Sequence, residues 1–246
     1  MKKITLTLAL LVSALMIFAQ DNACSIGLQL GFSQSIYRCN SPSNDDLGKV
    51  GLNGGKIGFV FEGNIIKGFG AYLALNYTYG GGTTQWQKDG ELPCPRSRYR
   101  NNLHTLELAC DWQYKFAVAQ NTYIILYSGP TVQCNLSFHE QKFTQETPNG
   151  PINPVSQGKD QLIRKVETGD KDYKAYNRLN VTWGVGAGFQ YDRYYIRGGY
   201  DFGLINPYSY KDFNLINTFS KSNLSTRGRE DQWYVKLGIY LWQSDN

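Results

Sequence analysis

Strict alternation of apolar and polar residues limits the fold of this chain more than any other feature of its sequence. The alternation runs through eight stretches: residues 26–33, 56–62, 69–79, 104–116, 123–138, 179–191, 194–204 and 233–242. A period of two places successive side chains on opposite faces of a β-strand, whereas an amphipathic helix needs a period of about 3.6. The stretches therefore predict an all-β chain of eight strands.

The connections between these stretches are alternately long and short. Three are tight, at residues 63–67, 117–121 and 192–193, and four are long, at residues 38–49, 80–100, 139–178 and 205–231. This alternation is typical of an up-and-down antiparallel barrel whose two termini lie at the end that carries the short turns. The sequence predicts one domain over residues 20–246, without a linker.

Two classes of eight-stranded barrel fit this pattern, and they differ in which face of the strands points inward. A soluble barrel buries its apolar face, whereas a membrane barrel turns that face to lipid. Here the polar face is rich in Gly, Ala, Ser and Thr, which suit a narrow lumen, and aromatic residues concentrate near the strand ends, as they do at the two interfaces of a membrane. Most stretches have about ten residues or more, enough for a tilted strand to cross a bilayer. We therefore predict a transmembrane barrel with its apolar face outward.

The first 19 residues have the order of a secretory signal. Met1-Lys2-Lys3 is basic, residues 4–18 are mostly apolar, and Ala19 supplies a small residue at the expected cleavage point. An uncleaved membrane anchor is the first alternative, but the apolar run is short for a span. A lipoprotein attached at Cys24 is the second, but Asp21-Asn22-Ala23 is a poor lipoprotein signal. Loss of two lysines with the signal lowers the formal charge from +5 to +3 (5 − 2 = 3), which does not indicate a nucleic-acid partner.

Nothing in the sequence indicates a cofactor or a strong active-site motif. The chain has 2 His and no closely spaced Cys pair, which argues against the usual structural zinc motifs. No glycine-rich loop follows a strand and opens a helix, the arrangement that binds nucleotide phosphates. Ser137, His139 and Glu140 are a weak candidate for lipid hydrolysis, because Glu140 falls on the opposite face of its strand from the other two. We expect no cofactor, no metal ion and no catalytic residues.

The signal ending Ile17-Phe18-Ala19-Gln20, the strands rich in Gly and aromatic residues, and the final stretch at 233–242 resemble small outer-membrane β-barrel proteins of Bacteroidota. These proteins are labelled porin-family or PorT-like and share the OmpA/OmpX-type eight-stranded architecture. Lys236, Gly238 and Leu241 match part of the closing-strand signal for barrel assembly. The resemblance implies an outer-membrane protein with both termini in the periplasm.

Eight charged residues fall on the predicted lumen face: Lys56, Glu62, Glu107, Asp111, Lys115, Arg197, Asp201 and Lys236. Four are basic and four are acidic, so the set is formally neutral. A buried charge is costly unless it is paired and hydrogen-bonded. We therefore expect a salt-bridge network that closes the lumen, with an ion or proton path as the alternative.

The cysteines allow one disulfide and predict several free thiols. Cys39 and Cys94 fall in neighbouring outer loops, where an oxidising exterior would allow them to pair, and the sequence alone leaves this pairing open. Cys110 and Cys134 lie on adjacent strands but out of register, so we expect them to be free thiols facing lipid. Cys24 is expected to remain unpaired near the start of the barrel.

The long loops are where a rigid barrel would carry its specificity. Arg96, Arg98 and Arg100 are spaced by two. A solvated charged surface is the simpler interpretation of this cluster, and contact with lipopolysaccharide phosphates is the second hypothesis. We predict a non-enzymatic barrel that acts as a structural, adhesive or accessory subunit of an outer-membrane complex. A narrow channel or small-solute transporter is the alternative, and a lipid-modifying enzyme is less favoured. The expected partners are outer-membrane lipid, lipopolysaccharide and other outer-membrane proteins.

Overall fold

The computed structural model describes residues 24–40, 50–66, 68–83, 87–88, 96–145, 151–154, 159–160, 162, 165–168, 171–174, 177–205, 207 and 227–244. The predicted signal peptide, residues 1–19, lies outside these ranges. The strands within them are β1 (Cys24–Asn40), β2 (Val50–Ile66), β3 (Phe69–Thr83), β4 (Gln87–Lys88), β5 (Arg96–Ala119), β6 (Thr122–Gln145), β7 (Ile152–Pro154), β8 (Lys159–Asp160), β9 (Lys165–Thr168), β10 (Lys171–Lys174), β11 (Leu179–Tyr191), β12 (Tyr194–Gly203) and β13 (Arg227–Gln243). In the described part of the chain, no helix is both long enough and apolar enough to span a membrane.

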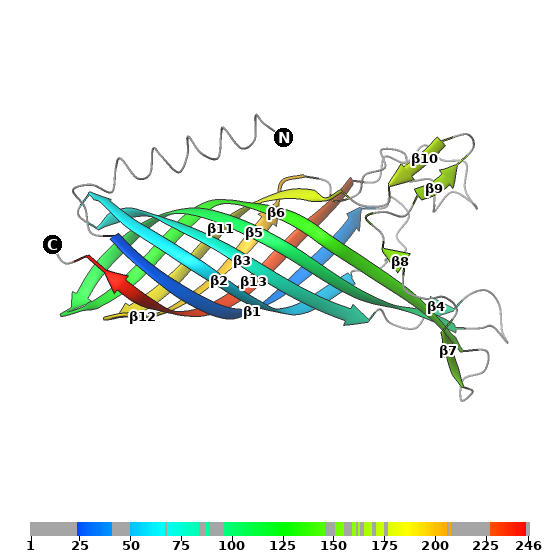
Figure 1. The fold of residues 1–246 in the computed structure, drawn as a ribbon, viewed down its shortest axis with the longest axis horizontal. Coiled ribbons are helices and arrows are strands. Elements are labelled where there is room, and N and C mark those ends of the chain that lie inside the picture. Colours follow the sequence, from blue (N-terminus) through cyan, green and yellow to red (C-terminus); the bar gives the residue numbers. More distant parts are fainter. Residues whose placement is uncertain are drawn as a thin grey trace.

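Eight of these strands form a closed antiparallel barrel. Around the ring they follow the order β1, β2, β3, β5, β6, β11, β12 and β13, and β13 then pairs with β1. Each strand therefore pairs with its neighbours in the chain, and Figure 1 shows the tilted strands wrapping around one long axis. The predicted eight-stranded, antiparallel, up-and-down fold is confirmed.

The pairing register fixes the tilt of the strands. One circuit starts at Cys24, passes Gly63, Ala71, Trp112, Ser128, Val185, Tyr200 and Trp233, and returns to β1 at Gln34. The register thus shifts by ten residues (34 − 24 = 10) in one turn around the barrel. With a rise of about 3.3 Å per residue and a strand spacing of about 4.8 Å, this shift tilts the strands by about 40°, so each residue advances about 2.5 Å along the axis.

Three tight turns lie at one end of the barrel, which we call the turn end; the opposite end is the loop end. Gly68 between β2 and β3 has a φ of 80°, Asn121 between β5 and β6 has 55°, and Asp192 between β11 and β12 has 51°. Positive φ is readily adopted by Gly and is better tolerated by Asn and Asp than by most residues. The sequence therefore supplies a suitable residue at each tight turn.

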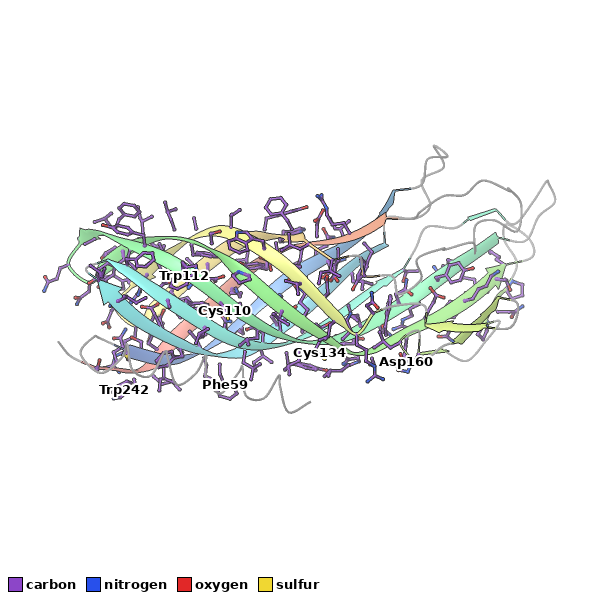
Figure 2. The ribbon with its side chains drawn as sticks, turned by 90° about the horizontal axis from the view of Figure 1, so that it is seen from above. Phe59, Cys110, Trp112, Cys134, Asp160 and Trp242 are labelled. Carbon is purple, nitrogen blue, oxygen red and sulfur yellow. The ribbon has the colours of Figure 1, made fainter. Side chains whose placement is uncertain are left out.

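The outer surface of the barrel is a band of exposed apolar side chains. Phe59 is 67% exposed and Leu30 is 63% exposed, although both lie in the middle of long strands. Figure 2 shows side chains standing away from the wall, with Phe59 on the outside and Trp112 and Trp242 toward the turn end. On β5 the outward apolar set runs from Leu106 to Phe116, which is about 25 Å along the axis and matches the apolar band of a membrane barrel.

Two bulges turn individual side chains away from the face that simple alternation predicts. Between β1 and β13 the register passes from Ile26–Trp242 to Gly27–Tyr240, so Trp242 is 52% exposed on the outer surface. Between β5 and β6 it passes from His104–Ser137 to Thr105–Asn135. The extra residue in each bulged strand shifts the alternation by one position.

The hairpin of β5 and β6 projects beyond the apolar band at the loop end. From Leu106, the last exposed aliphatic residue of β5 in this direction, the strand continues for ten residues to Arg96 (106 − 96 = 10), about 25 Å along the axis. Short strands extend the hairpin at its edges, with β4 paired to β5 and with β7 and β8 paired to β6. Figure 1 shows β4 and β7 at the far end of this projection. The predicted loops at 80–100 and 139–178 are therefore partly strand.

Candidate functional site

The lumen is the part of the barrel where charged and polar side chains gather. The structure places all eight charged residues of the predicted lumen face inside the barrel, on β2 (Lys56 and Glu62), β5 (Glu107, Asp111 and Lys115), β12 (Arg197 and Asp201) and β13 (Lys236). They form three ion pairs among themselves, each between different strands. Two members of the set, Asp201 and Lys236, are held differently.

At the turn end the lumen is closed by a cluster around Glu62 and Lys115. The two side chains form an ion pair, and the Lys115 ammonium also donates to Gln190 at 2.7 Å. The hydroxyl of Tyr240 donates to the second carboxylate oxygen of Glu62 at 2.5 Å. The Lys115 ammonium lies 5.6 Å from the centre of the Tyr240 ring. Four strands, β2, β5, β11 and β13, are thereby tied together across the interior.

The middle of the lumen is filled by Arg197, which is 0% exposed. Its guanidinium pairs with Asp111 at 3.1 Å and donates to Gln113 at 3.0 Å. The guanidinium carbon lies 3.5 Å from the centre of the Tyr72 ring and 3.9 Å from that of Tyr127. A desolvated cation between two aromatic faces gains about 2 kcal/mol or more from such a contact, so this group is both charged and tightly packed.

Asp201 and Lys236 are buried beside this centre without an ion pair. Among the described residues, neither forms a salt bridge or a side-chain hydrogen bond, although both are only 3% exposed. The Lys236 ammonium instead lies 4.2 Å from the centre of the Tyr234 ring. Buried charges of this kind are costly, so this level of the lumen is the least well satisfied part of the network.

Toward the loop end, Lys56 pairs with Glu107 at 2.5 Å and donates to Gln232 at 2.6 Å. Beyond them lies Glu230, a buried carboxylate that sequence reasoning missed. Asn180 donates to Glu230 at 2.8 Å. The sequence pattern predicts that Glu230 belongs to the loop at 205–231, but β13 begins at Arg227. The signal was present, since Glu230 continues the lumen alternation of Gln232 backward along the strand.

Glu230 changes the charge balance of the lumen. The predicted set had four acidic and four basic members, and adding Glu230 gives five acidic against four basic groups, a formal charge of −1 (4 − 5 = −1), among the residues described. Asp231, the next residue, does not add to this excess, because it pairs with Arg229 at 2.7 Å.

An apolar cluster lies above the polar lumen at the loop end. It consists of Tyr37, Leu52, Leu103, Phe138 and Leu162. Simple alternation places Phe138 on the lipid face, but it is 3% exposed inside the barrel because the β5–β6 bulge reverses the faces beyond it. Leu162 comes from the connection after β6 and is 0% exposed.

Asp160 holds the segment that carries Leu162. One Asp160 carboxylate oxygen accepts from the backbone N–H groups of Phe138 at 3.3 Å and Leu162 at 3.0 Å. β8, which contains Asp160, also pairs with β6 through His139 and Glu140. Figure 2 shows Asp160 at the loop end of the barrel. The connection is therefore fastened over the lumen by both backbone and side-chain contacts.

The cysteines agree with the sequence where the structure describes them. Within the described ranges, Cys24, Cys110 and Cys134 form no disulfide, and Cys134 pairs in register with Leu106 rather than with Cys110. The backbone of Cys39 lies in β1 opposite Gly228. The predicted partner Cys94 and the side chain of Cys39 lie outside the described residues, so that disulfide stays a prediction.

The three arginines spaced by two lie on the projecting part of β5. Arg100 is exposed, and Arg98 is half-buried with its guanidinium carbon 5.8 Å from the centre of the Phe143 ring on β6. The backbone of Arg96 begins β5, and its side chain lies outside the described part of the chain. The described positions thus bring two cations to one side of the hairpin.

The candidates for catalysis and metal binding do not form a centre. Ser137 pairs with His104 and His139 pairs with Asn102 across the hairpin; no hydrogen bond joins Ser137 to His139 in the described structure. Glu140 follows on the alternate position of the strand. Within the described ranges, no group of three or more His, Cys, Asp or Glu residues is arranged to hold a metal ion.

Comparison with known proteins identifies the family of this chain. The family model described as "Outer membrane protein beta-barrel domain" matches residues 18–209. No curated protein is significantly similar to the chain in sequence.

Several solved outer-membrane barrels are similar in structure. Ail of Yersinia pestis is 10% identical with a TM-score of 0.36, and Neisserial surface protein A is 13% identical with a TM-score of 0.41; each comparison covers 89% of this chain and 99% of the other. The N-terminal barrel of Pseudomonas aeruginosa OprF is 12% identical with a TM-score of 0.28, over 86% of this chain and 97% of the other. The chain, with its closed eight-stranded ring and exposed apolar band, belongs to the outer-membrane protein beta-barrel domain family and is an integral protein of the outer membrane.

Proposed function

We propose that this protein is a non-enzymatic outer-membrane barrel with a side-chain-filled lumen that acts through its loop end, as a structural, adhesive or accessory subunit of an outer-membrane complex. In this proposal residues 1–19 are a cleaved signal peptide, and both termini and the turn end face the periplasm. The short turns and the family's membrane location support this orientation. The signal and closing-strand patterns support placement among the PorT-like proteins of Bacteroidota.

The observation that carries the proposal is that interacting side chains occupy successive levels of the lumen. The Glu62–Lys115 cluster lies at the turn end, Arg197 lies between Tyr72 and Tyr127 in the middle, and Leu162 is buried at the loop end. An eight-stranded ring has an interior just wide enough for its side chains to fill. A lumen packed in this way leaves the loops and the outer surface to make contact with partners.

Single-channel recording on the purified full-length mature chain in planar bilayers tests the closed lumen. We expect no reproducible unitary current steps. An Arg197→Ala, Tyr72→Ala double variant, which removes the central packing, serves as the matched comparison and should conduct if it remains a heat-modifiable barrel. Regular steps from the unaltered protein would contradict the proposal.

A narrow ion path is the second candidate, and one observation favours it. Asp201 and Lys236 are buried without ion pairs among the described residues, and buried polar atoms of Thr78, Gln133 and Thr182 have no hydrogen-bond partner. Polar groups of this kind are commonly satisfied by buried water. A path of this type would give small unitary steps that change in ion selectivity on Asp201→Asn.

The accessory role and the absence of catalysis have separate tests. Affinity capture from native outer membrane, compared with a variant whose β7–β10 connection is replaced by a short linker, should recover a partner that depends on this connection. Purified protein should hydrolyse no outer-membrane lipid. Hydrolysis that disappears in both Ser137→Ala and His139→Ala would instead identify the protein as a lipid-modifying enzyme.

A further inference from the structure

We propose that Asp160 and Leu162 form a latch that seals the loop end of the lumen and can be released while the rest of the barrel stays closed. The inference deepens the proposed accessory role and rests on it, because the connection that carries the latch is the one proposed to contact a partner. A partner that pulls on this connection would open the loop-end half of the lumen to water. The loop end would thereby have two states, latched and released.

One member of the apolar cluster at the loop end does not belong to the barrel wall. Leu162 lies in the connection after β6, whereas the other members lie on β1, β2, β5 and β6: Tyr37, Leu52, Leu103 and Phe138. The Leu162 side chain is 0% exposed, so the wall residues enclose it completely. Because Leu162 is in none of the eight strands of the ring, it can leave the cluster without breaking the ring.

The side-chain fastening of the latch depends on one carboxylate. A single Asp160 oxygen accepts from the backbone N–H groups of Phe138 at 3.3 Å and Leu162 at 3.0 Å. β8 has only two residues and pairs with β6 at His139 and Glu140. The Asp160 side chain is half-buried, so water can compete for its oxygens. Loss of this one acceptor removes both side-chain contacts at once.

The latch lies where a continuous wall strand ends. The pairing of β6 with β11 stops at Cys134 and Leu179, and the N–H of Asn135 then donates to the carbonyl of Arg178 at 2.7 Å. Farther toward the loop end, the short strand β8 pairs with β6 in place of β11. Segments with few hydrogen bonds and few buried contacts open at a lower free-energy cost than the long strands of a core. We therefore expect the latch to open locally.

The latch covers polar groups that would gain hydrogen bonds from water. On β6, Gln133 lies five residues from Phe138 toward the turn end (138 − 133 = 5), about 10 Å along the axis after the bulge is counted. All eight wall strands are described at this level. Among the described residues, buried Nε2 of Gln133 and Oγ1 of Thr182 have no hydrogen-bond partner, and the Glu230 carboxylate accepts from Asn180 at 2.8 Å. Water that enters here satisfies these groups, which favours the released state.

Release of the latch does not open a path through the barrel. Arg197 still fills the middle of the lumen, with its guanidinium carbon 3.5 Å from the Tyr72 ring centre and 3.9 Å from that of Tyr127, and it pairs with Asp111 at 3.1 Å. These partners lie on the wall strands β3, β6 and β5 rather than in the connection. The released state therefore differs from a conducting state.

The test measures how fast a charged, membrane-impermeant thiol reagent reaches a cysteine beneath the latch. Thr182→Cys is a suitable reporter, because the Thr182 side chain is 0% exposed and its hydroxyl has no hydrogen-bond partner among the described residues. The mature full chain in nanodiscs is treated with a cationic methanethiosulfonate, and peptide mass spectrometry reads modification of the reporter alone. We expect slow modification behind the intact latch, and rates at least about tenfold higher with Leu162→Asp or Asp160→Ala.

Matched variants separate release of the latch from general loosening of the barrel, and heat-modifiable gel mobility confirms that each one folds. Leu162→Met keeps an apolar side chain and Asp160→Asn keeps a carbonyl acceptor, so both should raise the rate less. A second reporter, Val60→Cys, lies two residues from Glu62 on β2 and should stay unreactive throughout. Rapid modification behind the intact latch, unchanged rates with Leu162→Asp and Asp160→Ala, or equal acceleration at Val60→Cys would each overturn the proposal. Latch variants should still give no current steps, so failure of the latch is distinguishable from failure of the closed lumen.

Discussion

The sharpest consequence of the lumen geometry concerns Arg197. We predict that Arg197→Met, which keeps much of the side-chain volume but removes the charge, strongly destabilises the folded barrel. The variant loses the ion pair to Asp111, the hydrogen bond to Gln113, and the contacts with the Tyr72 and Tyr127 rings. It also leaves the Asp111 carboxylate, only 4% exposed, without its cation.

The size of the effect follows from these contacts. A hydrogen bond to a charged group contributes about 1.5–3 kcal/mol, and a desolvated cation over an aromatic ring adds about 2 kcal/mol or more. Part of this lost stabilisation is offset, because burying methionine does not carry the desolvation cost of burying a charged group. Removing one partner of a buried ion pair costs about 3–5 kcal/mol in proteins, and we expect Arg197→Met to fall in that range.

A double-mutant cycle isolates the pair from its surroundings. Asp111→Leu alone should cost about 3–5 kcal/mol, because it leaves Arg197 as an unpaired buried cation. The combined variant should cost clearly less than the sum of the two, since neither charge is then stranded, with a coupling of about 3 kcal/mol. Asp201→Asn is the matched control, because Asp201 has no ion pair or side-chain hydrogen bond among the described residues, and we expect it to be neutral or stabilising.

Equilibrium unfolding in guanidinium chloride, with the barrel in lipid vesicles and tryptophan fluorescence as the signal, measures these free energies. Heat-modifiable gel mobility confirms that each variant starts as a folded barrel. A change of less than about 1 kcal/mol for Arg197→Met, the size of a weak surface pair, would refute the reasoning. Strict additivity in the cycle would do so as well, and so would an Asp201→Asn effect as large as that of Asp111→Leu.

Three further changes test the packing of the wall and the direction in which its faces point. Gly129→Ala should lower folding yield or cost about 1–3 kcal/mol, because its Cβ would lie 2.1 Å from the Cys110 carbonyl oxygen, whereas Gly55→Ala, with nothing within 4 Å, should fold normally by the same gel assay. Phe59→Arg should cost about 2–4 kcal/mol at the level of the lipid core, and equal stability in unfolding titrations would contradict the outward placement of this side chain. Cys110 and Cys134 should react with a lipid-soluble maleimide but not with a charged, membrane-impermeant one, as read by mass spectrometry on vesicles; the reverse preference would place both thiols in water.

The membrane-spanning part of the barrel could be predicted from sequence because apolar side chains that face lipid alternate there with small or polar side chains that face the lumen. On β11, for example, Trp183 and Val185 face outward while Thr182 and Gly184 face inward. The pattern stops giving this signal where the strands leave the bilayer. Arg98, Tyr99 and Arg100 alternate in direction but are all amphipathic or polar, so nothing in the sequence distinguished this part of β5 from a loop.

The β-bulges, and which lumen charges pair with each other, could not be predicted from sequence for a different reason. A single extra residue near Leu136 reverses the faces beyond it, and this is why Phe138 is inside. The lumen charges could be identified as a set from their alternation, but their pairing depends on the register shift around the ring. Arg197 and Asp201 are on one strand and one face, yet Arg197 is paired with Asp111 of β5 while Asp201 has no comparable partner among the described residues.

The contacts of the inner-face glycines also explain why small residues and large lumen side chains occur together. A Cβ on Gly186 would lie 2.3 Å from the Tyr127 ring, and one on Gly238 would lie 2.1 Å from the Tyr195 ring. These glycines provide the space in which the tyrosine rings lie, and the Tyr127 ring in turn holds Arg197. The glycine-rich inner face therefore does not indicate an open pore. Gly186 and Gly238 each allow a tyrosine from a neighbouring strand to reach into the lumen, and a wide channel at these levels would require replacement of the tyrosines rather than of the glycines.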